Sequence, residues 1–225
     1  MPELPLPHRT APPRAAEPPY PCLLLLHGRG ADEHDLLDLA ELLDPRLLGI
    51  SVRAPLPAPG LPGYQWHTSL GAGRPEPGSM LQSLETLRAV LAALPAACGA
   101  DPGRLFVLGF SQGAAMALAL GSAMPQEVAG TIALSGYWPP VARPEGLRGR
   151  PVFVGHGRDD AVVPLTLGRA VRDALAGAGA ELEYHEEYAV GHGILPEELG
   201  DVAAWIRARL GATPPGAGAR TRRPC

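Results

Sequence analysis

Short, continuous apolar runs alternate along this chain with longer segments in which apolar residues recur every three or four positions. The strand-like runs are PCLLLLHG, LLGISVRAP, RLFVLGF, VAGTIALSG and RPVFVGHG, followed by the more polar ELEYHEEY. Strands that are apolar throughout are typical of parallel sheets buried on both faces. Helical spacing is found in SMLQSLETLRAVLAALPAA, SQGAAMALALGSAM, PLTLGRAVRDALAGAG and PEELGDVAAWIRARL. The alternation predicts an α/β fold with a mostly parallel central sheet and helices on both faces.

The two ends of the chain differ in composition from the middle. Residues 1–19 are rich in proline, and residues 212–225 are rich in proline, glycine and arginine. Segments of this composition bury little apolar surface and hold no motif. We therefore expect one domain over residues 20–211, between a mobile N-terminal tail and a disordered C-terminal tail. We also expect removal of either tail to change activity little.

Composition and charge exclude several classes of protein. The chain has 225 residues, 46% of them hydrophobic, and a net charge of −4 without a long basic run. The charge argues against nucleic acid or an anionic membrane as the main partner. No apolar run reaches the roughly 20 residues of a membrane span, and the start lacks the pattern of a signal peptide. The three cysteines are scattered without a disulfide or zinc pattern, so we expect a cytoplasmic protein.

A serine stands at the junction of a strand and a helix in LFVLGFSQGAAMALAL. The residues from Gly109 to Gly113 fit G-x-S-x-G, with Ser111 at the centre. After a strand and before a helix, this motif predicts a sharp turn that exposes the hydroxyl at the helix N-terminus, where the helix dipole favours negative charge. The alternative is a serine that only caps the helix, beside two incidental glycines in a glycine-rich chain.

A serine hydroxyl becomes a strong nucleophile when a histidine, oriented by a carboxylate, takes its proton. In this architecture the acid and then the histidine follow the serine along the chain. Asp159 and Asp160 follow the strand VFVG, and either could orient a histidine. His192 lies between two glycines in the loop before the last helix, where it could also be a simple helix-capping residue. His156 is expected to make a local turn contact, and His185 to be a surface or structural residue.

Hydrolysis of an ester also needs N–H groups directed at the developing negative charge. The backbone N–H of Gln112, directly after the serine, is one predicted donor. The loop HGRGADEHD follows the first apolar strand, and Gly28 and Gly30 allow a turn in which the N–H of Arg29 is the second donor.

Three rival interpretations follow from the same residues. The first is a metallohydrolase, because five potential ligands lie close together, but H-E-x-x-H spacing is absent, so we expect neither a metal nor a cofactor. The second is a non-catalytic binding module, which usually lacks one of the three catalytic residues. The third is a hydrolase with a cysteine nucleophile, against which Ser111 argues. The potential ligands are His27, Asp32, Glu33, His34 and Asp35.

Four segments together resemble the phospholipase/carboxylesterase branch of the bacterial α/β-hydrolases, relatives of the acyl-protein thioesterases. They are LLHGRGADEHDLLDLAELLDP, GFSQGAAMAL, GHGRDDAVVP and GHGI, and the resemblance runs from about Tyr20 to Leu210. It implies an α/β-hydrolase fold with a minimal lid, and hydrolysis of carboxylic esters or thioesters through an acyl-enzyme. A lysophospholipase or acyl-protein thioesterase-like activity is the alternative. Small-molecule ester substrates are implied, and some members form homodimers.

The resemblance also assigns roles to residues. It selects Asp160 as the carboxylate and His192 as the base, with Arg29 and Gln112 as the oxyanion donors. Arg29 departs from the family, because many esterase members carry leucine there, and this leaves the acyl preference open. The segment GYQWHTSLGAGRPEPGS lies where the family has a substrate loop, so Trp66 is expected either to wall the substrate pocket or to lie in the core.

The expected acyl length follows from composition. Aromatic residues make up 5% of the chain, and there is little room for a lid domain. A long acyl tunnel is therefore not evident in the sequence, which favours short or medium acyl chains.

Overall fold

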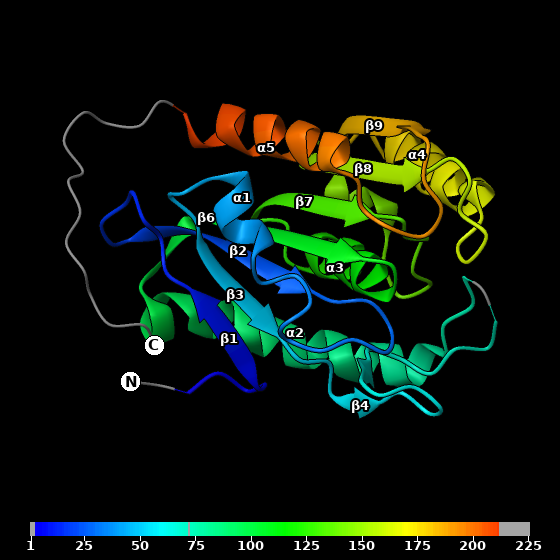
Figure 1. Cartoon of the computed structure of the whole chain (residues 1–225), viewed down its shortest axis with the longest axis horizontal. Coiled ribbons are helices and arrows are strands. Elements are labelled where there is room, and N and C mark those ends of the chain that lie inside the picture. The colour runs from blue at the N-terminus through cyan, green and yellow to red at the C-terminus, as the bar shows by residue number, and fades with distance from the viewer. Residues whose placement is uncertain (1–2, 72, 212–225) are drawn as a thin grey trace.

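A central sheet of seven strands organises the part of the chain that the computed structural model describes, residues 3–71 and 73–211 (Figure 1). In spatial order they are β1 (His8–Ala11), β3 (Leu48–Val52), β2 (Tyr20–Leu26), β6 (Ala100–Phe110), β7 (Val128–Leu134), β8 (Pro151–Gly157) and β9 (Glu181–Tyr188). Strand β1 pairs antiparallel with β3, and all other neighbours pair parallel. This arrangement agrees with the predicted mostly parallel sheet.

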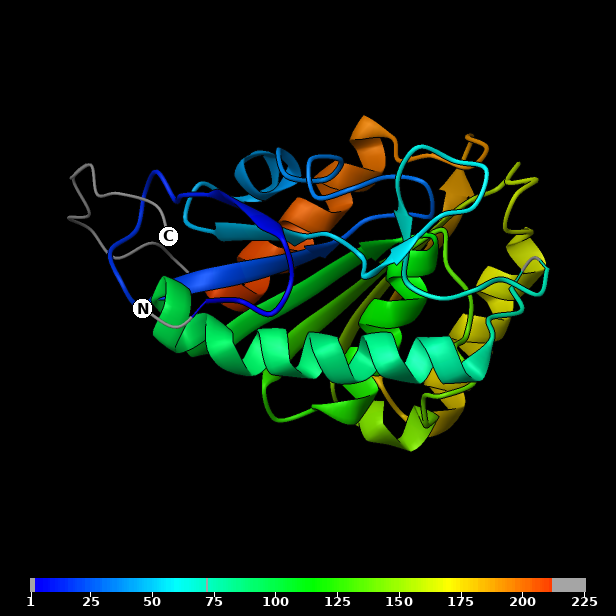
Figure 2. The same ribbon diagram turned by 90° about the horizontal axis from the view of Figure 1, so that it is seen from below.

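Helices cover both faces of the sheet (Figure 2). One face carries α2 (Pro77–Cys98), α3 (Gln112–Ala123) and α4 (Leu165–Ala178), and the other carries α1 (Leu39–Leu43) and α5 (Pro196–Leu210). Within the described ranges, no helix is both long enough and apolar enough to cross a membrane. Short elements complete the structure: the strand pair β4 (Leu56–Pro57) and β5 (Tyr64–Gln65), and the 3-10 helix η1 (Pro144–Leu147).

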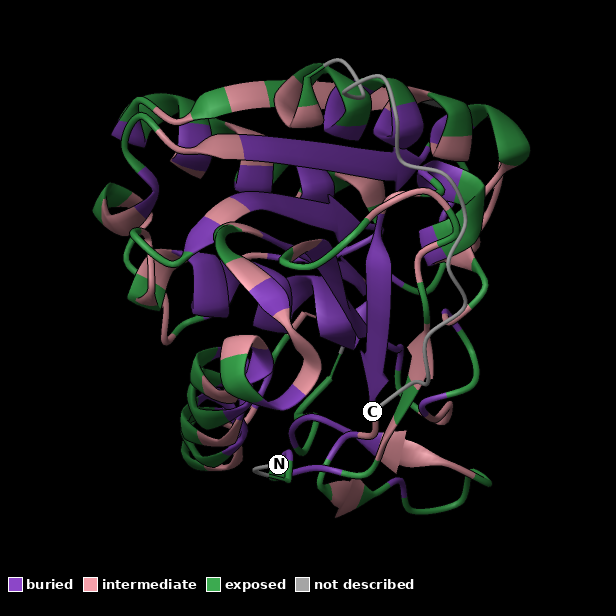
Figure 3. Cartoon of the chain, turned by 90° about the vertical axis from the view of Figure 1, so that its left-hand side faces the viewer, coloured by how far each residue is buried: buried purple, intermediate pink, exposed green. Residues whose placement is uncertain are grey.

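The apolar strands divide their side chains between the two faces. In β2, Leu24 and Leu26 pack with α2 and α3, whereas Leu23 and Leu25 pack toward α1 and α5. Figure 3 shows the central strands almost wholly buried, with exposed residues on the outer sides of the helices. Burial on both faces explains why these strands are continuous apolar runs rather than alternating ones.

The start of the chain differs from the mobile tail that we expect over residues 1–19. Strand β1 extends the sheet at its edge, and the N–H of Arg53 donates to the carbonyl of Pro7 at 2.8 Å. The side chains of Leu4 and Leu6 are buried in the core under that edge. A high proline content does not exclude a strand here, because prolines are tolerated beside an edge strand, where few ladder hydrogen bonds are required. The predicted C-terminal tail, residues 212–225, lies outside the described residues.

Candidate active site

Ser111 occupies a strained turn between β6 and α3. Its φ of 56° and ψ of −116° lie in a region that residues with a side chain rarely adopt. A side chain on Gly109 would overlap the carbonyl of Gly113, and one on Gly113 would overlap the carbonyl of Leu26. Both glycines are therefore required by close approach of the backbone, and they are not incidental products of composition.

A hydrogen-bonded chain joins Ser111 to two residues from later in the sequence. The Ser111 hydroxyl donates to His192 Nε2 at 2.9 Å, and His192 Nδ1–H donates to Asp160 Oδ2 at 2.7 Å. The ring of His192 packs against that of Phe110, with 4.8 Å between ring centroids. The three residues follow β6, β8 and β9, whose carboxyl ends lie at the same edge of the sheet. The structure thus brings together Ser111 and the two residues, Asp160 and His192, that the resemblance selects as its partners.

The two neighbouring aspartates differ in environment. Asp160 is buried, and its Oδ1 accepts from the N–H groups of Val162 and Val163 at 2.9 and 2.8 Å. The side chain of Asp159 is exposed, with its carboxylate 3.8 Å from the guanidinium of Arg158. Only Asp160 is hydrogen-bonded to the histidine, because the turn points the two side chains in different directions.

The other two histidines considered above have structural contacts. His156 is fully buried, and its Nε2–H donates to the carbonyl of Val163 at 2.8 Å, which confirms the predicted turn contact. The ring of His185 stacks on that of Phe153, with centroids 5.2 Å apart. Neither ring takes the place of His192 beside the serine.

The predicted oxyanion donors are the N–H groups of Arg29 and Gln112. No hydrogen bond joins either N–H to another residue in the described part of the chain. The turn before Arg29 lies against the serine, since a Cβ at Gly28 would be 3.6 Å from the Cβ of Ser111. Two unpaired N–H groups beside a serine hydroxyl are what stabilisation of an oxyanion requires.

The side chain of Gln112 is held on both sides by the segment before α2. Its Oε1 accepts from the N–H of Trp66 at 3.1 Å, and its Nε2 donates to the carbonyl of His67 at 3.2 Å. The ring of Trp66 is fully buried, and its indole N–H donates to the carbonyl of His27 at 2.8 Å. Of the two expectations for Trp66, the core position is therefore the one observed, and its link to the site is through its backbone.

A buried pair supports the same segment and was not found from the sequence. His67 Nδ1–H donates to the carbonyl of Thr68 at 3.0 Å, and the hydroxyl of Tyr137 donates to His67 Nε2 at 2.7 Å. Burial lowers the pKa of His67 and raises the pKa of Tyr137, so both are neutral. The contact joins residues 70 positions apart, and no local sequence pattern predicts it.

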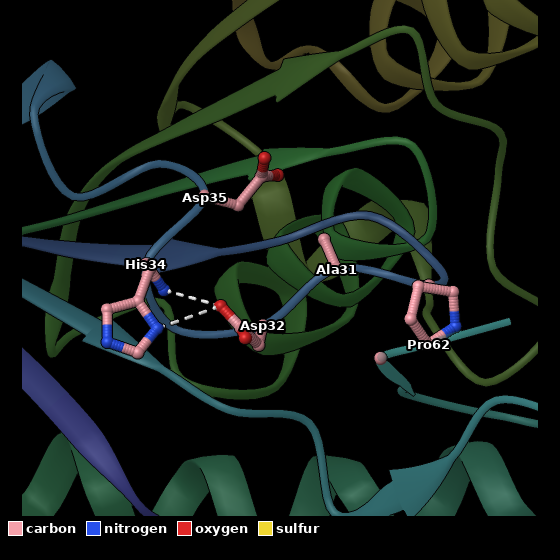
Figure 4. Close-up of a pocket in the computed structure, with 7 residues that line it drawn as sticks. Ala31, Asp32, His34, Asp35 and Pro62 are labelled. Carbon is pink, nitrogen blue, oxygen red and sulfur yellow. Dashed lines mark hydrogen bonds and ion pairs between the residues drawn. The ribbon is translucent and has the colours of Figure 1, made fainter.

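The cluster behind the metal hypothesis has other partners. Ligand atoms of Asp32, Glu33 and His34 lie within 4.8 Å of one another. Glu33 accepts two hydrogen bonds from Arg53, both 2.6 Å long, and the hydrogen bond from Arg53 lowers its pKa. Asp32 accepts from the N–H of His34 at 2.9 Å (Figure 4). The cluster borders a surface cleft of about 310 Å³ lined by Gly30, Ala31, Asp32, His34, Asp35, Pro62 and Gly63.

His27, another residue of that hypothesis, lies outside the cluster. Its Nδ1–H donates to the carbonyl of Gly28 at 2.7 Å, and its Nε2 accepts from the N–H of Ala54 at 3.0 Å. Desolvation by burial lowers its pKa, so the ring is neutral. Hydrogen bonds thus account for four of the five residues of the metal hypothesis, and the fifth, Asp35, lines the cleft.

The parallel sheet and the strained serine turn at the end of β6 define an α/β-hydrolase. A sequence profile of the phospholipase/carboxylesterase family matches residues 13–210, and the chain belongs to that family. The acyl-protein thioesterase 1 of Mycosarcoma maydis is 30% identical over 223 residues, which cover 86% of this chain and 93% of that protein.

Two further relatives agree with this assignment. Carboxylesterase SOBER1 of Arabidopsis thaliana is 31% identical over 137 residues, which cover 59% of this chain and 60% of that protein. The crystal structure of esterase PE8 superposes with a TM-score of 0.80 and 30% identity, covering 90% of this chain and 98% of that one. The protein is therefore an esterase-type hydrolase.

Proposed function

We propose that the protein hydrolyses carboxylic esters or thioesters with Ser111 as nucleophile, through a covalent acyl-enzyme. The observation that carries this proposal is the hydrogen-bonded chain from Ser111 through His192 to Asp160. His192 Nε2 takes the hydroxyl proton as the oxygen attacks the substrate carbonyl. Asp160 holds the ring in the tautomer with the proton on Nδ1, and it stabilises the imidazolium that forms.

The tetrahedral intermediate places a negative charge on the former carbonyl oxygen. The free N–H groups of Arg29 and Gln112 stabilise that charge, and loss of one such donor typically costs about 10²–10³ in rate. His192 then gives its proton to the leaving alcohol or thiol. Water, deprotonated by the same histidine, hydrolyses the acyl-enzyme and releases Ser111.

Short or medium acyl chains on small alcohols are the proposed substrates, and lysophospholipids or acylated proteins are the alternative within the same chemistry. We further propose that the protein acts in the cytoplasm, without a cofactor and without nucleic acid. The limited aromatic content, 5% of residues, supports the shorter chains.

One series of measurements tests both nucleophile and chain length. Wild-type protein should hydrolyse p-nitrophenyl acetate and butyrate with a higher kcat/KM than long-chain esters or lysophospholipids. Ser111→Ala should abolish hydrolysis of every ester while keeping the thermal transition of the wild type. Ser122→Ala, at the opposite end of α3, is the matched control and should keep its activity. More than a few per cent of wild-type activity in pure Ser111→Ala protein would refute the assignment.

A further inference from the structure

Arg29 presents a positive charge that no carboxylate of the described residues neutralises. Its side chain is exposed, its Nε–H donates to the Gln65 side-chain carbonyl at 3.2 Å, and a terminal N–H approaches the carbonyl of Pro59 at 3.5 Å. Both acceptors are uncharged. Because a guanidinium has five N–H donors, most of them are left for solvent or a ligand.

This charge belongs to a residue whose backbone is part of the proposed site. The backbone of Arg29 carries one proposed oxyanion donor, and the preceding Gly28 lies against Ser111. Gln65, which holds the guanidinium, is buried, and its own side-chain amide donates to the carbonyl of Pro57 at 3.0 Å. The guanidinium is therefore held by Gln65, which directly precedes the two residues that hold the side chain of Gln112.

The electrostatics of the neighbouring histidine agree with this position. Burial lowers the pKa of His67, and the positive charge of Arg29 lowers it further. The carbonyl of His67 accepts from the side chain of Gln112, the other oxyanion residue. Arg29 is therefore close enough to interact with His67, which in turn holds the side chain of Gln112.

Three carboxylates of the surrounding loops are already hydrogen-bonded to other groups. Glu33 accepts from Arg53, Asp32 from His34, and Asp160 from His192. An anion that bound Arg29 would not need to displace an internal partner. The charge is thus available to a substrate.

We propose that Arg29 binds a carboxylate carried by the substrate, so that the preferred substrates are esters with an anionic group a few atoms from the scissile carbonyl. Half-esters of short dicarboxylic acids have this chemistry on the acyl side. The guanidinium and carboxylate form a charge-assisted hydrogen-bonded pair, which is strong and directional. This inference rests on the proposed function of Ser111 and names the substrate class of that site.

The test compares monomethyl glutarate with dimethyl glutarate, which has the same chain but no charge. Hydrolysis is followed by proton release, and the result is the ratio of kcat/KM for the anionic ester to that for the neutral ester. The wild-type ratio should favour the anion. Arg29→Met should lower this ratio about tenfold to a hundredfold, the range of one charge-assisted pair, chiefly through KM of the anionic ester. Arg29→Lys keeps the charge without the planar fork and should give an intermediate ratio.

Arg148→Met is the matched control, because it makes the same change of net charge at an exposed residue just after η1, at the opposite edge of the sheet. It should leave the ratio unchanged. A wild-type ratio at or below one, or an equal fall for both esters in Arg29→Met, overturns the inference. A preference for carboxymethyl butyrate over propyl butyrate, without a preference for monomethyl glutarate, would move the anion to the alcohol side and also overturn it.

A separate experiment distinguishes failure of the proposed function from failure of the Arg29 inference. Labelling of wild-type protein, but not Ser111→Ala, by a fluorophosphonate probe reports the nucleophile independently of Arg29. If the probe labels Ser111 and neither glutarate ester is hydrolysed, the substrate inference fails and the serine assignment stands. If the probe does not label Ser111, the proposed function itself fails.

Discussion

At the scale of single residues, the carboxylate of Asp160 is fixed by hydrogen bonds to both of its oxygens. Oδ2 accepts from His192, and Oδ1 accepts from the backbone N–H groups of Val162 and Val163. Its neighbour Asp159 is exposed and touches none of these groups. One chain position therefore separates an aspartate that is hydrogen-bonded to the histidine from a solvated turn residue.

Replacing each aspartate by asparagine tests this difference. Asp160→Asn keeps the shape but favours the wrong tautomer of His192, and should lower kcat by about 10⁴. Asp159→Asn should stay within roughly tenfold of wild type, because exposed substitutions have small effects. Steady-state kinetics with p-nitrophenyl butyrate measures both. The reverse order would assign the acid to Asp159, and two active variants would place the acid elsewhere in the chain.

A second carboxyl group is buried without a comparable set of partners. Glu198 lies in the first turn of α5 with no exposed surface, and neither carboxyl oxygen has a hydrogen-bond partner of good geometry in the described part of the chain. It packs behind β8, where a side chain on Gly155 would overlap its carboxyl group. Burial raises the pKa of Glu198 to about 7. The backbone N–H of Leu195 opposes this shift, Asp201 adds to it, and His185 opposes it. The folded protein thus favours the neutral acid.

This shift predicts how stability depends on pH. The pKa is about 7 in the folded protein against an ordinary 4.5, so the stability linked to protonation is complete below about pH 4.5 and is lost as the pH rises through about 7. Relative to wild type, Glu198→Gln should gain roughly 2–3 kcal/mol between about pH 5 and about pH 8. Urea unfolding of both proteins across this range measures the difference. A difference that does not change with pH would contradict it.

At the scale of elements, β1 and the residues before it belong to the folded domain. Leu6 is 6% exposed beneath the sheet edge, whereas Leu42 on α1 is 63% exposed. Leu6→Ala should therefore cost about 2–4 kcal/mol of unfolding free energy, and Leu42→Ala should cost about 0.5 kcal/mol or less. Chemical denaturation of the two variants measures this. Equal, small effects would show that residues before β1 do not pack against the sheet.

The sequence predicted most of the sheet and helices, and the physical reason lies in burial. Strands such as β2 and β6 are covered on both faces, so every residue of the run is apolar and the pattern is unambiguous. The serine turn was predictable because close backbone contacts require Gly109 and Gly113 there. Local sequence and tertiary structure agree at these positions.

The parts that were missed depend on contacts distant in sequence. The side chain of Gln112 is held by Trp66 and His67, which lie 46 and 45 positions earlier in the chain. The hydrogen-bond partner of His67 is Tyr137, 70 positions later. Strand β1 has no apolar pattern of its own and forms because β3 offers it an edge. Neither type of contact produces a periodic pattern in the sequence, so both are visible only in the folded structure.

At the scale of the whole molecule, the sheet order assembles the proposed site. Ser111, Asp160 and His192 come from segments after three different strands, and the Arg29 loop follows β2, next to β6 in the sheet. Parallel strands direct all of these segments to one edge, as in other open α/β sheets. The hydrogen-bonded chain spans 81 residues between Ser111 and His192, so it forms only when the domain is folded.

The most direct test of Ser111 as the nucleophile is to trap the proposed acyl-enzyme. Wild-type protein is mixed with p-nitrophenyl butyrate, quenched in acid during turnover, digested, and examined by mass spectrometry. We expect one butyryl group on the peptide that contains Ser111, and none on the same peptide from Ser111→Ala protein. A butyryl group on another residue, or turnover by wild-type protein with every acyl adduct independent of Ser111, would contradict it.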